Sequence, residues 1–320
     1  SFANKFKMSM PGRFFIQKLI KQAVESNCQY MILEMTSQGV LQFRHKFTEL
    51  DALVFTNLSP EHIESHGSYE KYIEAKLEIA KEISKSNKRP RIVVSNADDS
   101  EGYKFLNTNV EIKKSYTLKD QNIDTPLLGD FNKYNVLASI TLAKAMGISD
   151  EIIYKAISNF KKVPGRVEFI NVGQNFNVIV DYAHTTDSLS KLYSVFKRKE
   201  KQKNICILGG TGGGRDIWKR KEMGKIADLN CDEIILTNED PYDEDPMQII
   251  SHVADGIKNK KPKIIMDRRD AIAYAISSAK SGDNIIITGK GTDPYIMGPN
   301  NSKIPWSDAE ISKEEILKTI

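Results

Sequence analysis

Five short apolar runs recur along the second half of the chain, and helical patterns separate them. The runs are FNVIVDYAH, NICIL, EIILT, KIIM and NIIIT. The helical patterns fall at about residues 187–200, 218–230, 246–259 and 268–280. Continuous apolar strands are typical of a sheet that is covered on both faces. This alternation of strands and helices predicts a parallel, doubly wound α/β sheet of Rossmann-like topology.

The first half has a similar but less regular α/β pattern. The elements expected there are helices at 13–27, from near Ser68, at 132–146 and at 150–160, and buried strands in QYMILEMTS (29–37), at 51–56 and at 91–95. The polar segment 98–125 is expected to be irregular, with two short edge strands. Pro164-Gly165 is the clearest break in the pattern. We therefore predict one domain over residues 1–163 and a second over 164–320.

The composition suits a globular protein, because 40% of the 320 residues are apolar and 28% are charged. The net charge of +4 agrees with a small anionic substrate and is far from a nucleic-acid-binding signature. Cys28, Cys206 and Cys231 are widely spaced, so we expect reduced core cysteines. No apolar run approaches a membrane span, and no signal core follows the basic start. The sequence thus predicts a cytoplasmic protein without a membrane partner.

Three chemically useful side chains follow the predicted strands of the first half. Glu34 lies in the strand-like run at 29–37, His62 follows the strand at 51–56, and Lys76 lies in the helix after it. Ligands of parallel α/β sheets bind beyond the carboxyl ends of the strands, so we expect these side chains around one crevice. Together they can hold a divalent cation and a phosphate. Singly, each has a simpler explanation, since a lysine on a helix is usually a surface residue.

Two loops of the second half carry groups that could bind an anion or a nucleotide. LGGTGGGRD (208–216) is neither a dinucleotide fingerprint nor a Walker A loop, because Arg215 and Asp216 replace the residues that those motifs need. A tight turn explains it, although its glycines and Arg215 can also approach a carboxylate or phosphate. Asp181 can bind ribose hydroxyls, and His184 either lies beside a phosphate or base or simply caps a helix.

Two further loops are acidic or glycine-rich. NEDPYDEDP (238–246) places five acidic groups beyond a strand, and GKGTD (289–293) follows the last strand. A solvated loop and a turn explain these segments by themselves. Their position at the ligand-binding edge also suits the binding of an ammonium group.

As a set, these segments resemble the Mur ligases, in particular the branch that adds the third amino acid of the peptidoglycan stem. The resemblance covers essentially all 320 residues. The segments that carry it are MPGRFFIQKLI, LEMTSQGVLQFR, TNLSPEHIESHG with YIEAK, LLGDFNKYN, VPGRVE, DYAHTTDSL, GGTGGGRDIWKRKEMGKIA, NEDPYDEDP and GKGTDPY. The resemblance implies a central ATPase domain, truncated at its N-terminus, and a Rossmann-like C-terminal domain. It also implies a role in peptidoglycan synthesis, and so in cell wall biogenesis, cell shape and cell division.

The family's reaction would use ATP and Mg²⁺. ATP would phosphorylate the carboxylate of a UDP-N-acetylmuramoyl dipeptide, and the amine of a free amino acid would then displace the phosphate. The resemblance implies magnesium ligands and catalytic groups at Glu34, His62 and, if it is carbamylated, Lys76. It implies ATP contacts at Asn132, Asn135, Arg166, Asp181 and His184. It implies contacts to the muramoyl peptide or the amino acid at Ser37, Arg44, Arg215, Glu239, Asp240, Glu244, Gly289 and Asp293.

The chain departs from the family pattern in two ways. Neither a Walker A loop nor the family's N-terminal UDP-binding domain is recognisable in the 320 residues. We therefore expect this polypeptide alone to be an inactive fragment, or one half of a split enzyme whose N-terminal half is separate. Tyr242 stands where members that add diaminopimelate carry an arginine. Without that cation, the acidic side chains nearby predict a basic amino acid such as lysine or ornithine.

Three alternatives stay open on the sequence alone. The first is a folylpolyglutamate synthetase or another amide ligase of similar fold, although DYAHTTDSL and the GGRD segment favour the muramoyl branch. The second is a nicotinamide-dependent oxidoreductase built on the second half, which the imperfect glycine fingerprint disfavours. The third is a non-catalytic module that binds nucleotides or UDP-muramoyl peptides.

Overall fold

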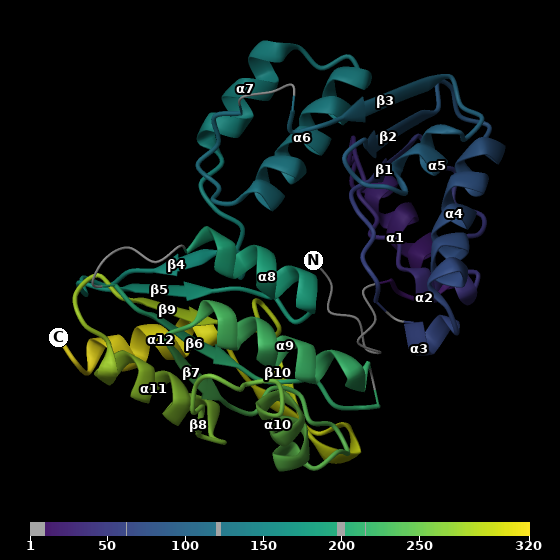
Figure 1. The fold of residues 1–320 in the computed structure, drawn as a ribbon. Helices are drawn as coiled ribbons and strands as arrows, with labels where there is room; N and C mark the ends of the chain where they lie inside the picture. Colours follow the sequence, from purple (N-terminus) through teal and green to yellow (C-terminus); the bar gives the residue numbers. More distant parts are fainter. Residues whose placement is uncertain (1–9, 62, 120–122, 197–201, 215) are drawn as a thin grey trace. The chain divides into compact units, whose positions relative to one another are not determined.

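The computed structural model describes residues 10–61, 63–119, 123–196, 202–214 and 216–320. It divides into two compact units, each with its own sheet and core (Figure 1). The first unit comprises Ser1–Thr125 and Asn132–Asn159, and the second comprises Pro126–Phe131 and Phe160–Ile320. The division thus falls at Asn159–Phe160, whereas the sequence pattern breaks at 163–164.

The first unit contains a parallel sheet with the strand order β1-β2-β3. Its elements are α1 (Arg13–Glu25), α2 (Ser37–Leu41), β1 (Ala52–Phe55), α3 (Ile63–His66), α4 (Tyr69–Lys85), β2 (Ile92–Asn96), α5 (Gly102–Leu106), β3 (Ile112–Tyr116), α6 (Asp130–Ala145) and α7 (Asp150–Asn159). Ser68 begins α4 by accepting a hydrogen bond from the Lys71 backbone. Alternate strand residues face opposite sides, so Val93 packs with α4 and α5, and Val94 packs with α6.

Two predictions for this unit are wrong. Residues 29–36 form no strand, and Ile32 is 95% exposed. An apolar run becomes a strand only where a neighbouring backbone pairs with it, and none of the described residues does so here. The polar segment 98–125 forms α5 and the single described strand β3 instead of two edge strands. The prediction missed α5, which packs through the buried Phe105 onto Phe55 of β1.

The second unit is built on a six-stranded sheet of order β4-β5-β9-β6-β7-β8, in which only the β4–β5 pair is antiparallel among the described strands. Its elements are β4 (Glu168–Ile170), β5 (Asn177–Val180), α8 (Thr186–Val195), β6 (Asn204–Leu208), α9 (Ile217–Asn230), β7 (Glu233–Leu236), α10 (Pro246–Ala254), β8 (Lys263–Ile264), α11 (Arg268–Ser278), β9 (Asn284–Ile287), β10 (Tyr295–Met297), η1 (Pro299–Asn301), β11 (Lys303–Pro305) and α12 (Asp308–Leu317). The predicted parallel α/β sheet is confirmed.

The two faces of this sheet are covered by different helices, as Figure 1 shows. Cys206 and Leu208 of β6 pack with α8, α9 and α10, whereas Ile205 and Ile207 pack with α11 and α12. All four of these side chains are at most 1% exposed. This double cover explains the continuous apolar strands and leaves the loops after the strands to carry the polar chemistry.

The prediction of reduced cysteines is wrong for two of the three. Cys206 of β6 and Cys231, which follows α9, form a fully buried disulfide with a Cα–Cα distance of 5.9 Å. Helix α9 brings the two together by returning the chain across the sheet, so 25 residues of sequence separation give no sign of the pairing. Cys28 is free and exposed.

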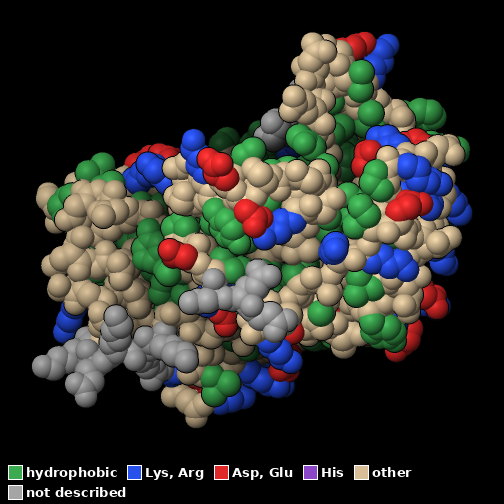
Figure 2. All heavy atoms as spheres, turned by 90° about the horizontal axis from the view of Figure 1, so that it is seen from above, with side chains coloured by type: hydrophobic (Ala, Val, Ile, Leu, Met, Phe, Trp, Pro, Cys, Tyr) green, Lys and Arg blue, Asp and Glu red, His purple; other side chains and the backbone are tan. Residues whose placement is uncertain are grey.

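Within the described ranges, no helix combines the length and apolar character needed to cross a membrane. On the face that Figure 2 shows, basic and acidic side chains are interspersed. That face therefore lacks the continuous basic field typical of a nucleic-acid-binding surface.

Candidate active site

Lys76 is the central feature of the first unit's candidate site. It projects from α4, and its Nζ donates a hydrogen bond to the carbonyl oxygen of Met35 at 3.3 Å. Burial lowers the pKa of Lys76, and the carboxylates of Glu34 and Glu61 oppose that shift. The chain therefore brings Lys76 beside the segment that carries Glu34, although that segment is not a strand. Sequence reasoning missed Glu61, which lies directly before His62.

Glu34 is exposed, and His62 lies outside the described residues. Among the described residues, no three His, Cys, Asp or Glu side chains converge on a metal position. The described part of the site therefore offers Glu34 and, after carbamylation, Lys76. Carboxylate and carbamate oxygens are hard donors of the kind that Mg²⁺ prefers, so the residues present fit the ion in chemical type.

Ser37 is the first residue of α2, and Arg44 follows the end of that helix. Ser37 is buried at the start of that helix, and its Oγ is 3.0 Å from Nε2 of the buried His66. Arg44 is half-buried and donates to the carbonyl oxygen of Met10. Sequence reasoning missed His66, which is the last residue of α3. A ligand at Ser37 would thus also meet the imidazole.

The two asparagines predicted to contact ATP both lie in α6. Asn132 is buried and Asn135 is exposed. Residues three apart are neighbours on a helix surface, so these two side chains lie on the same side of α6.

In the second unit, the three other predicted nucleotide residues gather after β5. The guanidinium carbon of Arg166 lies 4.4 Å from the centre of the Tyr182 ring, and Nδ1 of His184 is 2.8 Å from the Tyr182 carbonyl oxygen. Asp181 accepts hydrogen bonds from the backbone of Val167 and of Ala183, each at 2.7 Å. Burial raises the pKa of Asp181 although these bonds oppose the shift. Its Oδ2 thus already holds the linker turn through Val167, and its Oδ1 holds the loop that follows β5 through Ala183.

The acidic loop 238–246 carries fewer free charges than its sequence indicates. Oδ2 of Asp240 accepts from Lys290 Nζ at 2.8 Å, and Oδ1 accepts from the Met297 backbone at 2.7 Å. Glu244 accepts from Arg220 at 2.9 Å and from the Gly214 backbone at 2.6 Å. Burial would raise the pKa of Glu244, but these two hydrogen bonds outweigh it and lower the pKa.

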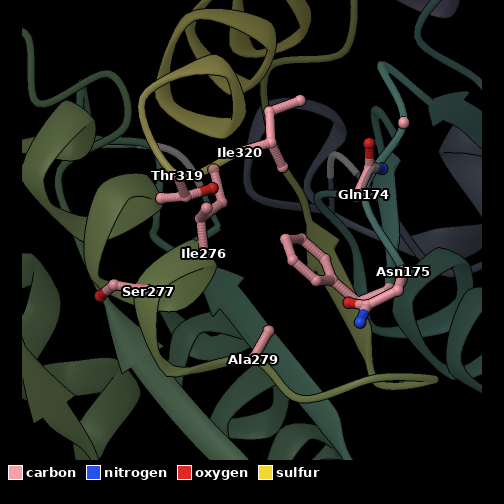
Figure 3. A pocket seen from close by; sticks show the side chains of 9 residues that line it. Gln174, Asn175, Ile276, Ser277, Ala279, Thr319 and Ile320 are labelled. Carbon is pink, nitrogen blue, oxygen red and sulfur yellow. The ribbon is translucent and has the colours of Figure 1, made fainter.

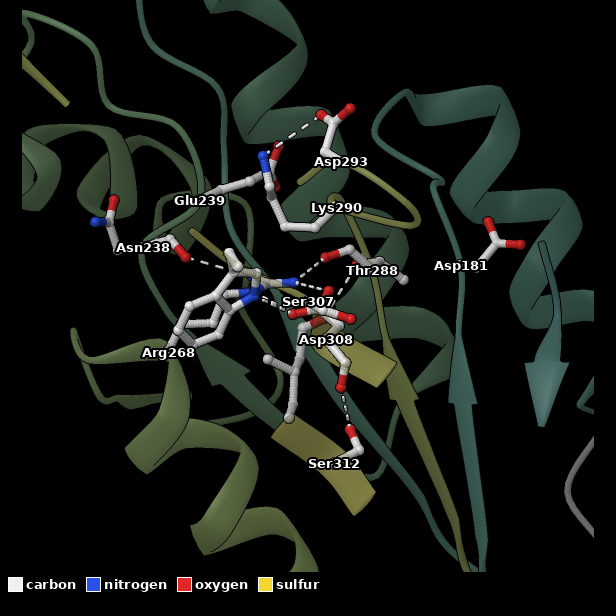
Figure 4. A network of polar contacts seen from close by, with 12 residues as sticks. Asp181, Asn238, Glu239, Arg268, Thr288, Lys290, Asp293, Ser307, Asp308 and Ser312 are labelled. Carbon is white, nitrogen blue, oxygen red and sulfur yellow. Dashed lines mark hydrogen bonds and ion pairs between the residues drawn. The ribbon is translucent and has the colours of Figure 1, made fainter. Parts of the chain in front are cut away.

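Lys290 is a cation that the sequence reasoning missed, and its side chain, like that of Arg220, is only 1% exposed. Lys290 stands inside GKGTD, between the predicted residues Gly289 and Asp293, and its Nζ is 3.4 Å from Asp293 Oδ2. A lysine flanked by glycines at the end of a strand was the available signal. Figure 4 shows Glu239, Lys290 and Asp293 gathered at the same end of the sheet.

The loops approach each other so closely that two positions have no room for a side chain, which explains why both are glycine. A Cβ on Gly289 would lie 2.2 Å from Glu239 Oε2, and a Cβ on Gly165 would lie 2.6 Å from the backbone of Gly291. Glu239 is buried, and its Oε1 accepts from the Thr211 hydroxyl at 2.9 Å. The loops after β5, β6, β7 and β9 thus meet at one edge of the sheet. Arg215, predicted to bind the amino acid's carboxylate, lies outside the described residues.

A separate hollow of about 630 Å³ lies at the opposite end of the strands of this sheet (Figure 3). Phe176 and Asn175, which precede β5, line it together with Ile276 and the last residue, Ile320. None of the predicted site residues is among the residues that line it.

Each of the two units contains a region that matches a known protein family. Residues 3–122 match the family described as the Mur ligase middle domain, and residues 165–291 match the Mur ligase, glutamate ligase domain. The chain is 35% identical to a UDP-N-acetylmuramyl-tripeptide synthetase of Borreliella burgdorferi, over 98% of this chain and 67% of the relative. It is 33% identical to a UDP-N-acetylmuramoyl-L-alanyl-D-glutamate–2,6-diaminopimelate ligase of Geobacillus kaustophilus, over 96% of this chain and 68% of the relative.

The solved structure of a UDP-N-acetylmuramoyl-L-alanyl-D-glutamate–2,6-diaminopimelate ligase is similar as well. It superposes with a TM-score of 0.58 at 26% identity, over 95% of this chain and 68% of that one. The chain thus spans about two thirds of the length of these relatives. These matches favour the amide-ligase interpretation and leave the oxidoreductase alternative without support.

Proposed function

The chain belongs to the Mur ligase family of ATP-dependent ligases, which add amino acids to UDP-muramoyl peptides, and from this premise we propose a specific reaction. In this proposal the protein acts in the cytoplasm and adds the third amino acid of the peptidoglycan stem to a UDP-N-acetylmuramoyl dipeptide. The incoming amino acid is a basic diamino acid such as lysine or ornithine.

The observation that carries the proposal is the approach of Lys76 to the backbone beside Glu34, at 3.3 Å from the Met35 carbonyl oxygen. A lysine in this position would become an anion if carbamylated, and its oxygens and the Glu34 carboxylate would then hold Mg²⁺. His62 would complete the set. ATP with Mg²⁺ supplies the phosphoryl group that activates the dipeptide carboxylate and neutralises the charge on the phosphate oxygens.

The charges of the second unit support a basic amino acid. Glu244 is matched by Arg220, but Lys290 has two carboxylate partners, Asp240 and Asp293. One negative charge is therefore left over at Lys290, and the buried Glu239 adds another. Among the described residues of these loops, this excess of negative charge favours a substrate that carries a side-chain ammonium and disfavours one that carries a second carboxylate.

Isothermal titration calorimetry of the 320-residue polypeptide tests the choice of amino acid. We expect L-lysine or L-ornithine to bind more tightly than diaminopimelate. Asp293→Asn should weaken lysine binding, because Asp293 is 43% exposed and shares its cation, Lys290, with Asp240. Lys313→Met provides a matched control, since it alters an exposed ion pair on α12. Tighter binding of diaminopimelate than of lysine would exclude a basic side chain as the preferred substrate.

A turnover assay tests the second part of the proposal, that this polypeptide alone is inactive. The 320 residues contain no Walker A loop to surround the β- and γ-phosphates of ATP. We therefore expect no phosphate release above the blank with ATP, Mg²⁺, UDP-muramoyl dipeptide and lysine. Measurable ligation by the purified polypeptide would refute this.

A further inference from the structure

Arg268 and Asp308 form an ion pair that is sealed inside the second unit (Figure 4). Their side chains are 1% and 0% exposed. Nε and Nη2 of Arg268 each donate to a different oxygen of Asp308 at 2.8 Å, which is a bidentate arrangement. The indole Nε1 of Trp306 also donates to Asp308 at 2.8 Å. The pair therefore has a fixed geometry.

The guanidinium also reaches the loops that contain the candidate amino-acid site. Nη2 of Arg268 donates to the carbonyl oxygen of Thr288 at 2.7 Å, and Nη1 donates to that of Asn238 at 3.3 Å. Thr288 directly precedes Gly289, and Asn238 directly precedes Glu239. One buried side chain thus holds the first residues of both loops.

A second link joins the same two loops. Lys290 reaches across from one loop to Asp240 in the other at 2.8 Å. A buried ion pair is often no more stabilising than well-packed apolar residues of similar volume. Apolar residues could replace the packing of Arg268 and Asp308, but they could not hold two carbonyl oxygens at a defined separation.

We propose that Arg268, oriented by Asp308, is a positioning residue that sets the separation of loops 238–244 and 289–293 and thereby forms the site for the incoming amine. This role rests on the proposed function of those loops for its ligand. The order of the loops themselves can be measured without any ligand, so the two ideas can fail separately.

The test compares a double variant, Arg268→Met with Asp308→Leu, with the control Arg269→Met. Arg269 joins the same two helices, because its guanidinium bonds to Glu314 and Glu315 of α12, whereas that of Arg268 bonds to the two loops. Circular dichroism establishes that each variant is folded. Hydrogen exchange then measures amides that the loop contacts protect, and calorimetry measures the affinity for L-lysine.

The amides to follow are those of Gly212, Tyr242 and Met297, which bond to Asp240 or across to Met297. In the double variant we expect their exchange to be about tenfold faster and the Kd for lysine about tenfold higher, as the loss of one or two hydrogen bonds to a charged group implies. In the control, both should stay within about twofold. Unchanged exchange and affinity in the folded double variant would overturn the proposal.

A second variant covers the case in which the double variant does not fold. Arg268→Lys keeps the charge beside Asp308, but an ammonium has three donors and no planar fork, so it cannot replace the four hydrogen bonds that Arg268 makes to Asp308, Asn238 and Thr288. We expect about threefold faster exchange of the same amides. Exchange rates equal to those of the unmodified chain would overturn the positioning role. If the unmodified chain does not bind lysine, the proposed substrate is wrong, and the exchange rates alone decide the role of Arg268.

Discussion

Replacing Gly165 by alanine should disrupt the junction between the linker that carries Arg166 and the loop that carries Asp293. Gly165 has φ +64, and a Cβ there would lie 2.6 Å from both the Gly291 carbonyl carbon and the Thr292 nitrogen. Both neighbours are backbone atoms, so neither can move aside by rotating a side chain. The left-handed conformation costs an alanine about 1–2 kcal/mol. The forced displacement of the two segments adds about 1–3 kcal/mol.

Gly214→Ala isolates the steric part of this effect. Gly214 belongs to the same unit and has nearly the same φ, +68, but nothing lies within 4 Å of its Cβ position. Its substitution should therefore cost only the conformational term, about 1–2 kcal/mol. The total for Gly165→Ala should be about 2–5 kcal/mol.

Tryptophan fluorescence during urea unfolding reports on this unit selectively, because Trp218 and Trp306 are the chain's two tryptophans and both lie in it. The difference in unfolding free energy between the two variants then measures the close approach. If Gly165→Ala were no more destabilising than Gly214→Ala, the tight contact between linker and loop would not exist in solution.

Three further predictions address other parts of the chain. With ¹³C-labelled bicarbonate, the polypeptide should show a carbamate carbon signal in NMR that is missing in Lys76→Met, whereas identical spectra would argue against modification of this residue. Hydrogen bonds from Arg91 hold the pKa of Glu111 at about 2, against an ordinary 4.5, so this contribution to stability is present above pH 4.5 and is lost as the pH falls toward 2. Glu111→Gln should flatten that part of the pH dependence measured by circular dichroism, and an unchanged profile would contradict the assignment. Lys290→Met leaves Asp240 without its cation and should lower the unfolding free energy by about 3–5 kcal/mol in urea titrations; a loss below about 1 kcal/mol would show that the pair is exposed to water.

The second unit could be predicted from the sequence because its signals are local. A strand such as Ile205–Leu208 is apolar throughout because helices cover both of its faces. The apolar run alone therefore predicts a strand that is buried on both sides. The run around Ile32 looks similar, but its structure depends on a partner strand that the local sequence does not encode. An apolar run indicates the capacity to be buried, and only pairing turns that capacity into a strand.

The site was less predictable, because its charge balance arises from contacts between distant segments. Asp240 and Lys290 are 50 residues apart, and Glu244 and Arg220 are 24 apart. From the sequence, the acidic loop indicates either a solvated surface or a receptor for ammonium groups. In the structure much of its charge is already neutralised by buried cations.

The selectivity of this edge should therefore depend on the charge that remains after pairing, and not on the number of acidic residues in the loop. Glu244 is fully matched by Arg220 and can contribute little to substrate choice. Asp293 shares Lys290 with a second carboxylate and is partly exposed, so it is the acid best able to meet a new cation. Since Arg268 bonds to the loops that carry both Asp240 and Lys290, the geometry of that residual charge should depend on a side chain that is itself only 1% exposed.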